Sequence, residues 1–148
     1  MGTSAKDFFS EQDQDDLRQA IMMAELDTSG EIRVHIENSC TGNVMDRAAF
    51  IFKQLEMHQT KLRNGVLIYL AIKNKRFAII GDSGIHQIVK EEFWDDVKQK
   101  MHLHFREGKY MDGLCHAIHA VGEKLKTHFP YQRNDINELP DEVSFGKD

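Results

Sequence analysis

The chain has 148 residues, a length that favours one domain around a single core. Its 24 acidic against 19 basic residues give a formal net charge of −5, which argues against nucleic acid as a partner and leaves metal ions open. The longest apolar run is far below the ~20 residues of a membrane-spanning helix, and residues 1–10 lack a signal-peptide core. We therefore expect a cytoplasmic protein without a membrane partner, with Cys40 and Cys115 as free thiols.

The first part of the chain predicts a helix, a strand and a second helix. Ser10 followed by acidic residues is typical of a helix start, and an apolar stripe continues this helix to about Leu26. From Glu31 to Glu37 apolar and polar residues alternate, which predicts a strand with one exposed face near the edge of the sheet. Helical spacing returns from about Met45 to Leu62, so this segment predicts a crossover to a parallel strand.

Two apolar runs in the middle of the chain predict a hairpin. The run over residues 66–72 is too short for a helix and predicts a strand buried on both faces. A short turn at residues 73–75 leads into a second run over 76–80. Because a strand buried on both faces needs helices on both sides, we expect an α/β fold, a three-layer α/β/α sandwich around a small mixed sheet.

The last part of the chain predicts two helices and a tail. Apolar residues repeat at helical spacing from about Phe93 to Phe105 and again from about Asp112 to His128, before Pro130. We expect a domain over residues 1–130 and an acidic C-terminal tail over 131–148. The tail is expected to pack in part through its apolar residues, which are Ile136, Leu139, Val143 and Phe145.

Polar residues gather at one predicted edge of the sheet. Glu31 and Asn64 begin two parallel strands, and Asp82 ends the strand that runs back beside them. The helix that follows adds acidic residues in its first turns. Clustered oxygens suit calcium, with magnesium as the alternative. The predicted metal ligands are Asp82, Glu31, Asn64, Asp95 and Asp96.

Each of these residues also has a purely structural interpretation. Asp82 would cap the helical turn that follows it, and Glu31 would pair with a surface lysine. Asn64 and Gly65 would form a turn, and the acidic residues at 91–96 would be a solvated helix start that the helix dipole favours.

Histidines and Cys115 on the last two helices do not follow a zinc-binding pattern. His116 and His119 are three residues apart beside Cys115, whereas His102 and His104 are two apart and point to different faces. The Cys-x-x-Cys and His-Glu-x-x-His motifs are both missing from the sequence. We therefore expect structural histidines and a core thiol whose pKa is raised by burial.

The order of several short segments resembles the TPM-domain family, which is named for thylakoid-lumen and photosystem-repair members. The segments are Ser29 to Val34, Asn64 to Ile68, Gly81 to Ile85 and Phe105 to Tyr110 with Gly113-Leu114 beyond, within residues 8–129. The resemblance implies an α/β/α sandwich, divalent-cation binding as in several members, and phosphatase activity as attributed to plant members. Where many relatives carry Gly-Tyr-Gly-Leu-Glu-Gly, this chain has Asp82 and Ser83.

Two functions follow as expectations. The first is a TPM-like binding or stress and repair module that holds calcium at the acidic corner of the sheet and acts through a protein partner. The alternative is a metal-dependent acid phosphatase acting on phosphate monoesters, for which the catalytic residues are unknown. A phosphatase needs positive groups around the phosphoryl group, and near the corner the candidates are Arg63, Arg76 and Lys90.

Overall fold

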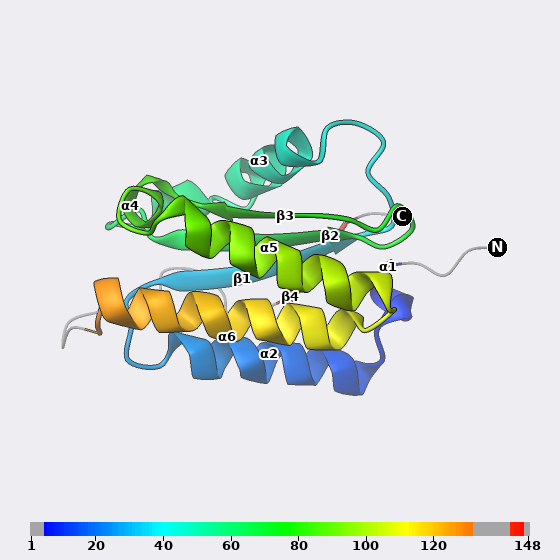
Figure 1. Cartoon of the computed structure of the whole chain (residues 1–148), viewed down its shortest axis with the longest axis horizontal. Helices are drawn as coiled ribbons and strands as arrows, with labels where there is room; N and C mark the ends of the chain where they lie inside the picture. Colours follow the sequence, from blue (N-terminus) through cyan, green and yellow to red (C-terminus); the bar gives the residue numbers. More distant parts are fainter. Residues whose placement is uncertain (1–4, 132–142, 147–148) are drawn as a thin grey trace.

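Four strands form one mixed sheet in the order β3-β2-β1-β4 in the computed structural model, which describes residues 5–131 and 143–146 (Figure 1). β1 (Glu31–Glu37) lies parallel to β2 (Gly65–Ala71) and to the short β4 (Val143–Phe145). β3 (Arg76–Gly81) runs antiparallel to β2, as the predicted hairpin requires.

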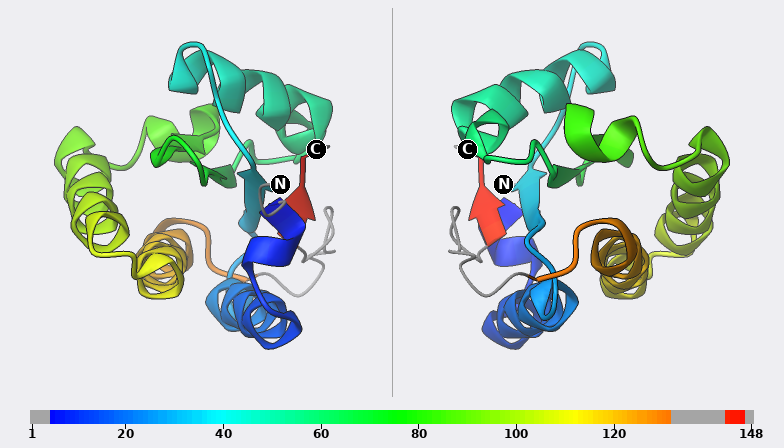
Figure 2. Two further views of the ribbon diagram at one scale, coloured as in Figure 1. Left: turned by 90° about the vertical axis from the view of Figure 1, so that its right-hand side faces the viewer. Right: turned by 90° about the vertical axis from the view of Figure 1, so that its left-hand side faces the viewer.

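Helices cover both faces of this sheet (Figure 2). One face carries α1 (Ala5–Phe8), α2 (Glu11–Glu25), α5 (Glu91–Arg106) and α6 (Tyr110–His128). The other face carries α3 (Val44–Gln54) and the short 3-10 helix η1 (Met57–Gln59), while α4 (Ser83–His86) follows β3. The predicted three-layer α/β/α sandwich with a mixed sheet is therefore confirmed.

The sheet separates two apolar clusters. The larger cluster joins the α2, α5 and α6 helices to one face of the strands and includes Ile32, Val66 and Ile68. The smaller cluster lies under α3 and contains Leu67 and Ala71. β2 sends alternate residues into each cluster, which is why its sequence is a continuous apolar run.

The ends of α2 show how local sequence sets the boundaries. Ser10 accepts a hydrogen bond from the Asp13 amide at 3.0 Å, and the Asp13 carboxylate accepts one from the Ser10 amide at 3.3 Å. This capping box satisfies amide groups that the helix itself leaves unpaired. The predicted helix start at Ser10 is therefore confirmed.

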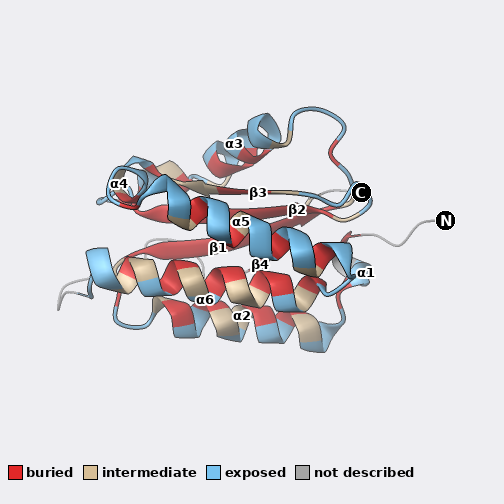
Figure 3. Ribbon diagram, viewed as in Figure 1, coloured by how far each residue is buried: buried red, intermediate tan, exposed pale blue. Residues whose placement is uncertain are grey.

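The predicted half-exposed strand over Glu31 to Glu37 is wrong. Every residue of β1 is buried, including the polar residues that alternate with its apolar ones (Figure 3). The strand is not at the edge, because β2 and β4 flank it on both sides. Arg33 and His35 lie on the same face as Leu67 and Tyr69, the face that α3 covers. The alternation of the sequence therefore marks a buried polar face.

The chain beyond residue 130 contributes to the sheet. Val143 pairs with Val34 and is 6% exposed, and Phe145 pairs with Ile36. Of the residues expected to anchor the tail, Ile136 and Leu139 lie outside the described residues. Within the described part, no helix is both long and apolar enough to cross a bilayer.

Candidate functional site

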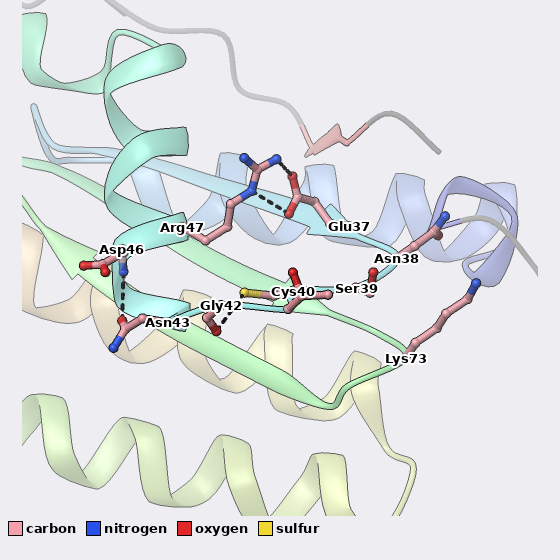
Figure 4. Close-up of a pocket in the computed structure, with 10 residues that line it drawn as sticks. Glu37, Asn38, Ser39, Cys40, Gly42, Asn43, Asp46, Arg47 and Lys73 are labelled. Carbon is pink, nitrogen blue, oxygen red and sulfur yellow. Dashed lines mark hydrogen bonds and ion pairs between the residues drawn. The ribbon is translucent and has the colours of Figure 1, made fainter.

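A crevice of about 610 Å³ opens at the carboxyl ends of β1 and β2 (Figure 4). β1 leads into α3 on one face of the sheet, whereas β4 is reached after α6 on the other face. In α/β sheets, ligands bind outside the carboxyl ends of strands where such connections diverge. The crevice is lined by residues 37–43 together with Asp46, Arg47 and Lys73.

A buried carboxylate, Glu37, is the centre of a hydrogen-bond network beside this crevice. Arg47 of α3 binds it through Nε at 3.0 Å and Nη2 at 2.5 Å, and the hydroxyl of Tyr69 donates to Oε2 at 2.5 Å. His35 Nε2 lies 3.4 Å from Oε1, and His35 Nδ1 lies 2.7 Å from the Ser144 hydroxyl oxygen. The network therefore joins β1, β2, β4 and α3 around one charge.

Local sequence explains how these groups meet. Glu37 and His35 are two residues apart on one strand, so their side chains share a face. Tyr69 is directly opposite His35 on β2. Asn43 accepts a hydrogen bond from the Asp46 amide at 3.0 Å, which starts α3 so that Arg47 lies in its first turn.

The network fixes the charges of its members at neutral pH. Burial alone would raise the pKa of Glu37, but the hydrogen bonds from Arg47 and Tyr69 and the charge of Arg47 outweigh it and lower that pKa. Burial lowers the pKa of His35, and the Glu37 carboxylate opposes this only in part. The site therefore holds an ionised glutamate beside a neutral histidine. A neutral ring donates from Nε2 to the carboxylate and accepts from Ser144 at Nδ1.

The register brings the predicted corner together at the opposite end of the sheet. Glu31 pairs with Gly65, and the Asp82 amide donates to the Gly65 carbonyl oxygen at 2.9 Å. Asp82, however, is bound by Arg63 through both carboxylate oxygens, at 2.7 and 2.8 Å. It also accepts from the Ser83 amide at 2.7 Å and caps α4. These contacts fit the alternative in which Asp82 is a helix cap.

The other predicted ligands have structural contacts or face solvent. Asn64 is 1% exposed and donates from Nδ2 to the Ser29 hydroxyl at 3.3 Å. Glu31 is buried at the start of β1. Asp95 and Asp96 are exposed on α5, whose Trp94 is the residue that faces Gly81. Within the described residues, no group of three or more His, Cys, Asp or Glu side chains could hold a metal ion.

The histidines of α5 and α6 lie near one another without forming such a group. The rings of His104 and His116 are 6.3 Å apart, and His104 is hydrogen-bonded to the Lys100 carbonyl oxygen. Cys40 and Cys115 are free thiols, as expected. Cys115 is partly buried against the larger apolar cluster, and this burial raises the pKa of its thiol and makes the thiol less reactive.

Sequence reasoning missed the Glu37 network although signals for it were present. Arg33, His35 and Glu37 follow one face of a predicted strand, and we expected that face to meet water. Tyr69 is the one polar group within the apolar run over residues 66–72. A hydroxyl in a strand buried on both faces requires a buried hydrogen-bond partner, and that requirement points to a neighbouring polar strand.

Comparisons with known proteins agree with this fold. The family model of the TPM domain matches residues 3–124, and the chain therefore belongs to the TPM-domain family. The solution structure of the BA42 protein from the psychrophilic bacterium Bizionia argentinensis is similar, with 42% identity over 95% of this chain and 97% of that one and a TM-score of 0.88.

Two more distant structures show the same fold. An N-terminal domain from P. gingivalis has 20% identity over 84% of this chain and 83% of that one, with a TM-score of 0.68. The N-terminal domain of the cg2496 protein from Corynebacterium glutamicum has 12% identity over 91% and 79% of the two chains, with a TM-score of 0.62. A comparison with curated proteins finds no match.

Proposed function

We propose that this TPM domain is a binding module that takes a divalent cation, preferably calcium, in the crevice at the carboxyl end of β1. The supporting observation is the chemistry of the lining. The loop after β1 supplies amide and hydroxyl oxygens, and Asp46 supplies a carboxylate. Calcium takes six to eight oxygen ligands, tolerates irregular loops and accepts water among them. The lining side chains that carry neutral oxygens are Asn38, Ser39, Thr41 and Asn43.

The crevice suits a cation better than the predicted corner does. At the corner, Arg63 occupies both oxygens of Asp82, so a cation would meet a guanidinium at the same carboxylate. In the crevice, the negative charge of Glu37 is neutralised by Arg47, whereas the Asp46 side chain is exposed on the first turn of α3. Because one carboxylate carries most of the attraction, we expect a dissociation constant of about 10⁻⁴ to 10⁻³ M.

The phosphatase alternative has less support. Phosphoryl transfer needs positive groups that stabilise the charge on the transferred group. Arg47 and Arg63, the arginines at the two candidate sites, are each bound to a carboxylate. Of the described residues that line the crevice, Lys73 is the other cation. Metal-dependent hydrolysis of an aryl phosphate, lost in Asp46→Asn, would favour the enzyme over the binding module.

A calcium titration of the full chain, followed by backbone amide NMR, tests the proposal and its location. We expect shifts over residues 38–47 in the wild type and in Asp82→Asn. Asp46→Asn should weaken binding about tenfold, which corresponds to about 1.4 kcal/mol. No shifts at millimolar calcium would contradict cation binding. Shifts confined to residues 63–65 and 82–84, and lost in Asp82→Asn, would instead place the cation at the corner.

Thermal unfolding gives an independent measurement. A ligand that binds only the folded chain stabilises it by about 2.7 kcal/mol at a hundredfold excess over its dissociation constant. Calcium should therefore raise the melting temperature of the wild type and of Asp82→Asn, and should raise that of Asp46→Asn much less. A melting temperature that calcium leaves unchanged in the wild type would contradict the proposal.

A further inference from the structure

The outer side of β3, at one edge of the sheet, has unused hydrogen-bonding groups. The Asp82 amide donates to the Gly65 carbonyl oxygen, and residues 76–81 continue this antiparallel ladder in register with β2. Every second residue therefore directs its amide and carbonyl groups to β2, and the intervening residues direct theirs outward. The outward residues are Phe77, Ile79 and Gly81. Within the described residues, no backbone group from another element pairs with them.

This edge forms the floor of a groove of about 520 Å³, with α3 as one wall and α5 as the other (Figure 2). Ile79 and Ile80 both line the groove although their side chains point to opposite faces of the sheet, so the groove follows the edge itself. Paired strands lie only about 4.8 Å apart, so a strand that pairs with β3 must lie between the two helices. The walls therefore admit a single strand and exclude the edge of a second folded sheet.

We propose that the groove binds an extended peptide segment of a partner protein, which adds to the sheet as a strand antiparallel to β3. The unused groups of the edge recur at every second residue, about 6.8 Å apart, and an extended polypeptide presents amide and carbonyl groups at the same repeat. A helix, a lipid or a nucleotide has no such repeat. In strand addition the main chain supplies affinity, and pockets for alternate side chains supply specificity.

The walls select apolar side chains in the middle of the peptide. Alternate side chains of an added strand point to opposite faces, one set towards α3 and the other towards α5. Towards α3 the groove is lined by Ile80, Met45 and Ala49. Towards α5 it is lined by Trp94, whose Cζ2 lies 3.1 Å from where a Cβ atom at Gly81 would be. The buried Trp94 indole nitrogen has no hydrogen-bond partner in the described part of the chain, which marks this wall as incomplete.

The direction of α5 sets the order of the charges along its wall. Trp94 covers Gly81 at one end of β3, and Phe105 contacts Phe77 at the other, with 5.2 Å between the ring centroids. α5 therefore runs antiparallel to β3. Glu91, which also lines the groove, precedes Trp94 by about one helical turn. The α5 wall is therefore acidic at the Gly81 end of the groove.

Lys98, one turn after the tryptophan, makes the same wall basic towards Phe77. Neither Glu91 nor Lys98 has an ion-pair partner among the described residues. The complementary antiparallel peptide begins with a basic residue opposite Gly81 and ends with an acidic one opposite Phe77, and both side chains point towards α5. Four residues span about 13.6 Å of a strand, and the seven from Glu91 to Lys98 span about 10.5 Å of a helix. Long charged side chains bridge this difference, whereas a parallel peptide would place like charges together.

A titration of the full chain with the peptide acetyl-Lys-Val-Ile-Val-Glu-amide tests the proposal through the emission of Trp94, the single tryptophan. We expect saturable binding. A methyl group on the amide nitrogen of the central isoleucine should weaken binding about tenfold, because that amide donates to the Ile79 carbonyl oxygen. The same methyl group on the following valine is the matched control, since that amide points away from β3 and its loss should change the affinity little. No saturable binding at millimolar peptide, or equal effects of the two methyl groups, would overturn strand addition.

Charge reversal and hydrogen exchange test the place and direction of the peptide. Lys98→Glu should weaken binding about fivefold, because it sets a like charge beside the acidic end of the peptide. A peptide that ends in lysine should restore the affinity for this variant. Lys100→Glu is the matched control, because Lys100 is exposed on the same helix and does not line the groove. The peptide should protect the amides of Phe77, Ile79 and Gly81 from exchange. Binding without this protection, or equal effects of Lys98→Glu and Lys100→Glu, would overturn the proposal.

Discussion

At the scale of single residues, Glu37 is the most constrained side chain of the crevice. It is 6% exposed and receives hydrogen bonds from two other elements, so its charge is stabilised by geometry and not by water. A buried carboxylate that loses a hydrogen-bond donor is destabilised, because water cannot replace the donor as it does for an exposed carboxylate. Substitutions around Glu37 should therefore have larger effects than similar changes at the surface.

Tyr69→Phe tests how much the hydrogen bond from the Tyr69 hydroxyl to the Glu37 carboxylate contributes to stability. The change removes one hydroxyl while preserving the ring, so it should lower the free energy of unfolding by about 1.5–3 kcal/mol. It should also raise the pKa of Glu37, because a hydrogen bond to the charged form is lost. Urea unfolding and carboxyl-carbon NMR measure the two effects. Tyr131→Phe is the control, since Tyr131 is 54% exposed, and equal effects of the two changes would contradict the argument.

At the scale of elements, the junction between β3 and α4 depends on a close backbone approach. A Cβ atom added at Gly84 would lie 2.1 Å from the Leu62 carbonyl oxygen and 2.6 Å from that of Arg63. The Gly84 amide donates to the Arg63 carbonyl oxygen at 2.8 Å, so the two segments cannot separate without losing this bond. Glycine is needed at position 84 because a side chain would overlap the carbonyl oxygens of Leu62 and Arg63, and not because of its backbone angles.

Gly84→Ala should therefore destabilise the fold, at or above the upper end of the ~1–3 kcal/mol that is typical of overpacking. Urea unfolding measures the loss. Gly42→Ala is the matched control, because a Cβ atom at Gly42 has nothing within 4 Å and should change stability little. If Gly84→Ala is as stable as Gly42→Ala, the junction is less tightly packed than the distances indicate.

At the scale of the whole molecule, the buried network makes stability depend on pH. The pKa of His35 is lowered by burial from its ordinary value of 6.5, so the unfolded chain binds its proton first as the pH falls. The pKa of Glu37 is lowered as well, from 4.5, by its donors. Both groups stabilise the fold above their ordinary pKa values and lose that contribution on acidification.

The free energy of unfolding should accordingly decrease as the pH falls below about 6.5, and decrease further below about 4.5. Urea unfolding as a function of pH measures both ranges. His35→Gln should flatten the upper range even if it lowers stability overall. His116, whose pKa is also lowered by burial and by Lys100, acts in the same range, so His116→Gln is measured in parallel. An unchanged slope in His35→Gln would show that His35 does not titrate in this way.

Local patterns in the sequence determined the elements and the class of fold. The apolar run over residues 66–72, the turn at 73–75 and the helical stripes are properties of neighbouring residues, and each element that they predicted is present. The helix predicted from about Met45 to Leu62, however, ends at Gln54, because Glu56 takes a left-handed backbone conformation and the chain continues as η1. The order of short segments likewise identified the family. The edge shared by Glu31, Asn64 and Asp82 followed from strand direction alone.

Only the tertiary structure decided what the polar residues do. Whether Arg33, His35 and Glu37 meet water depends on β4, which joins β1 from more than one hundred residues away, and on α3. Whether Asp82 is available depends on Arg63, which approaches it from the loop before β2. Periodicity reports which face a side chain takes, but the partner on that face comes from distant parts of the chain, and the partner determines burial, charge and function.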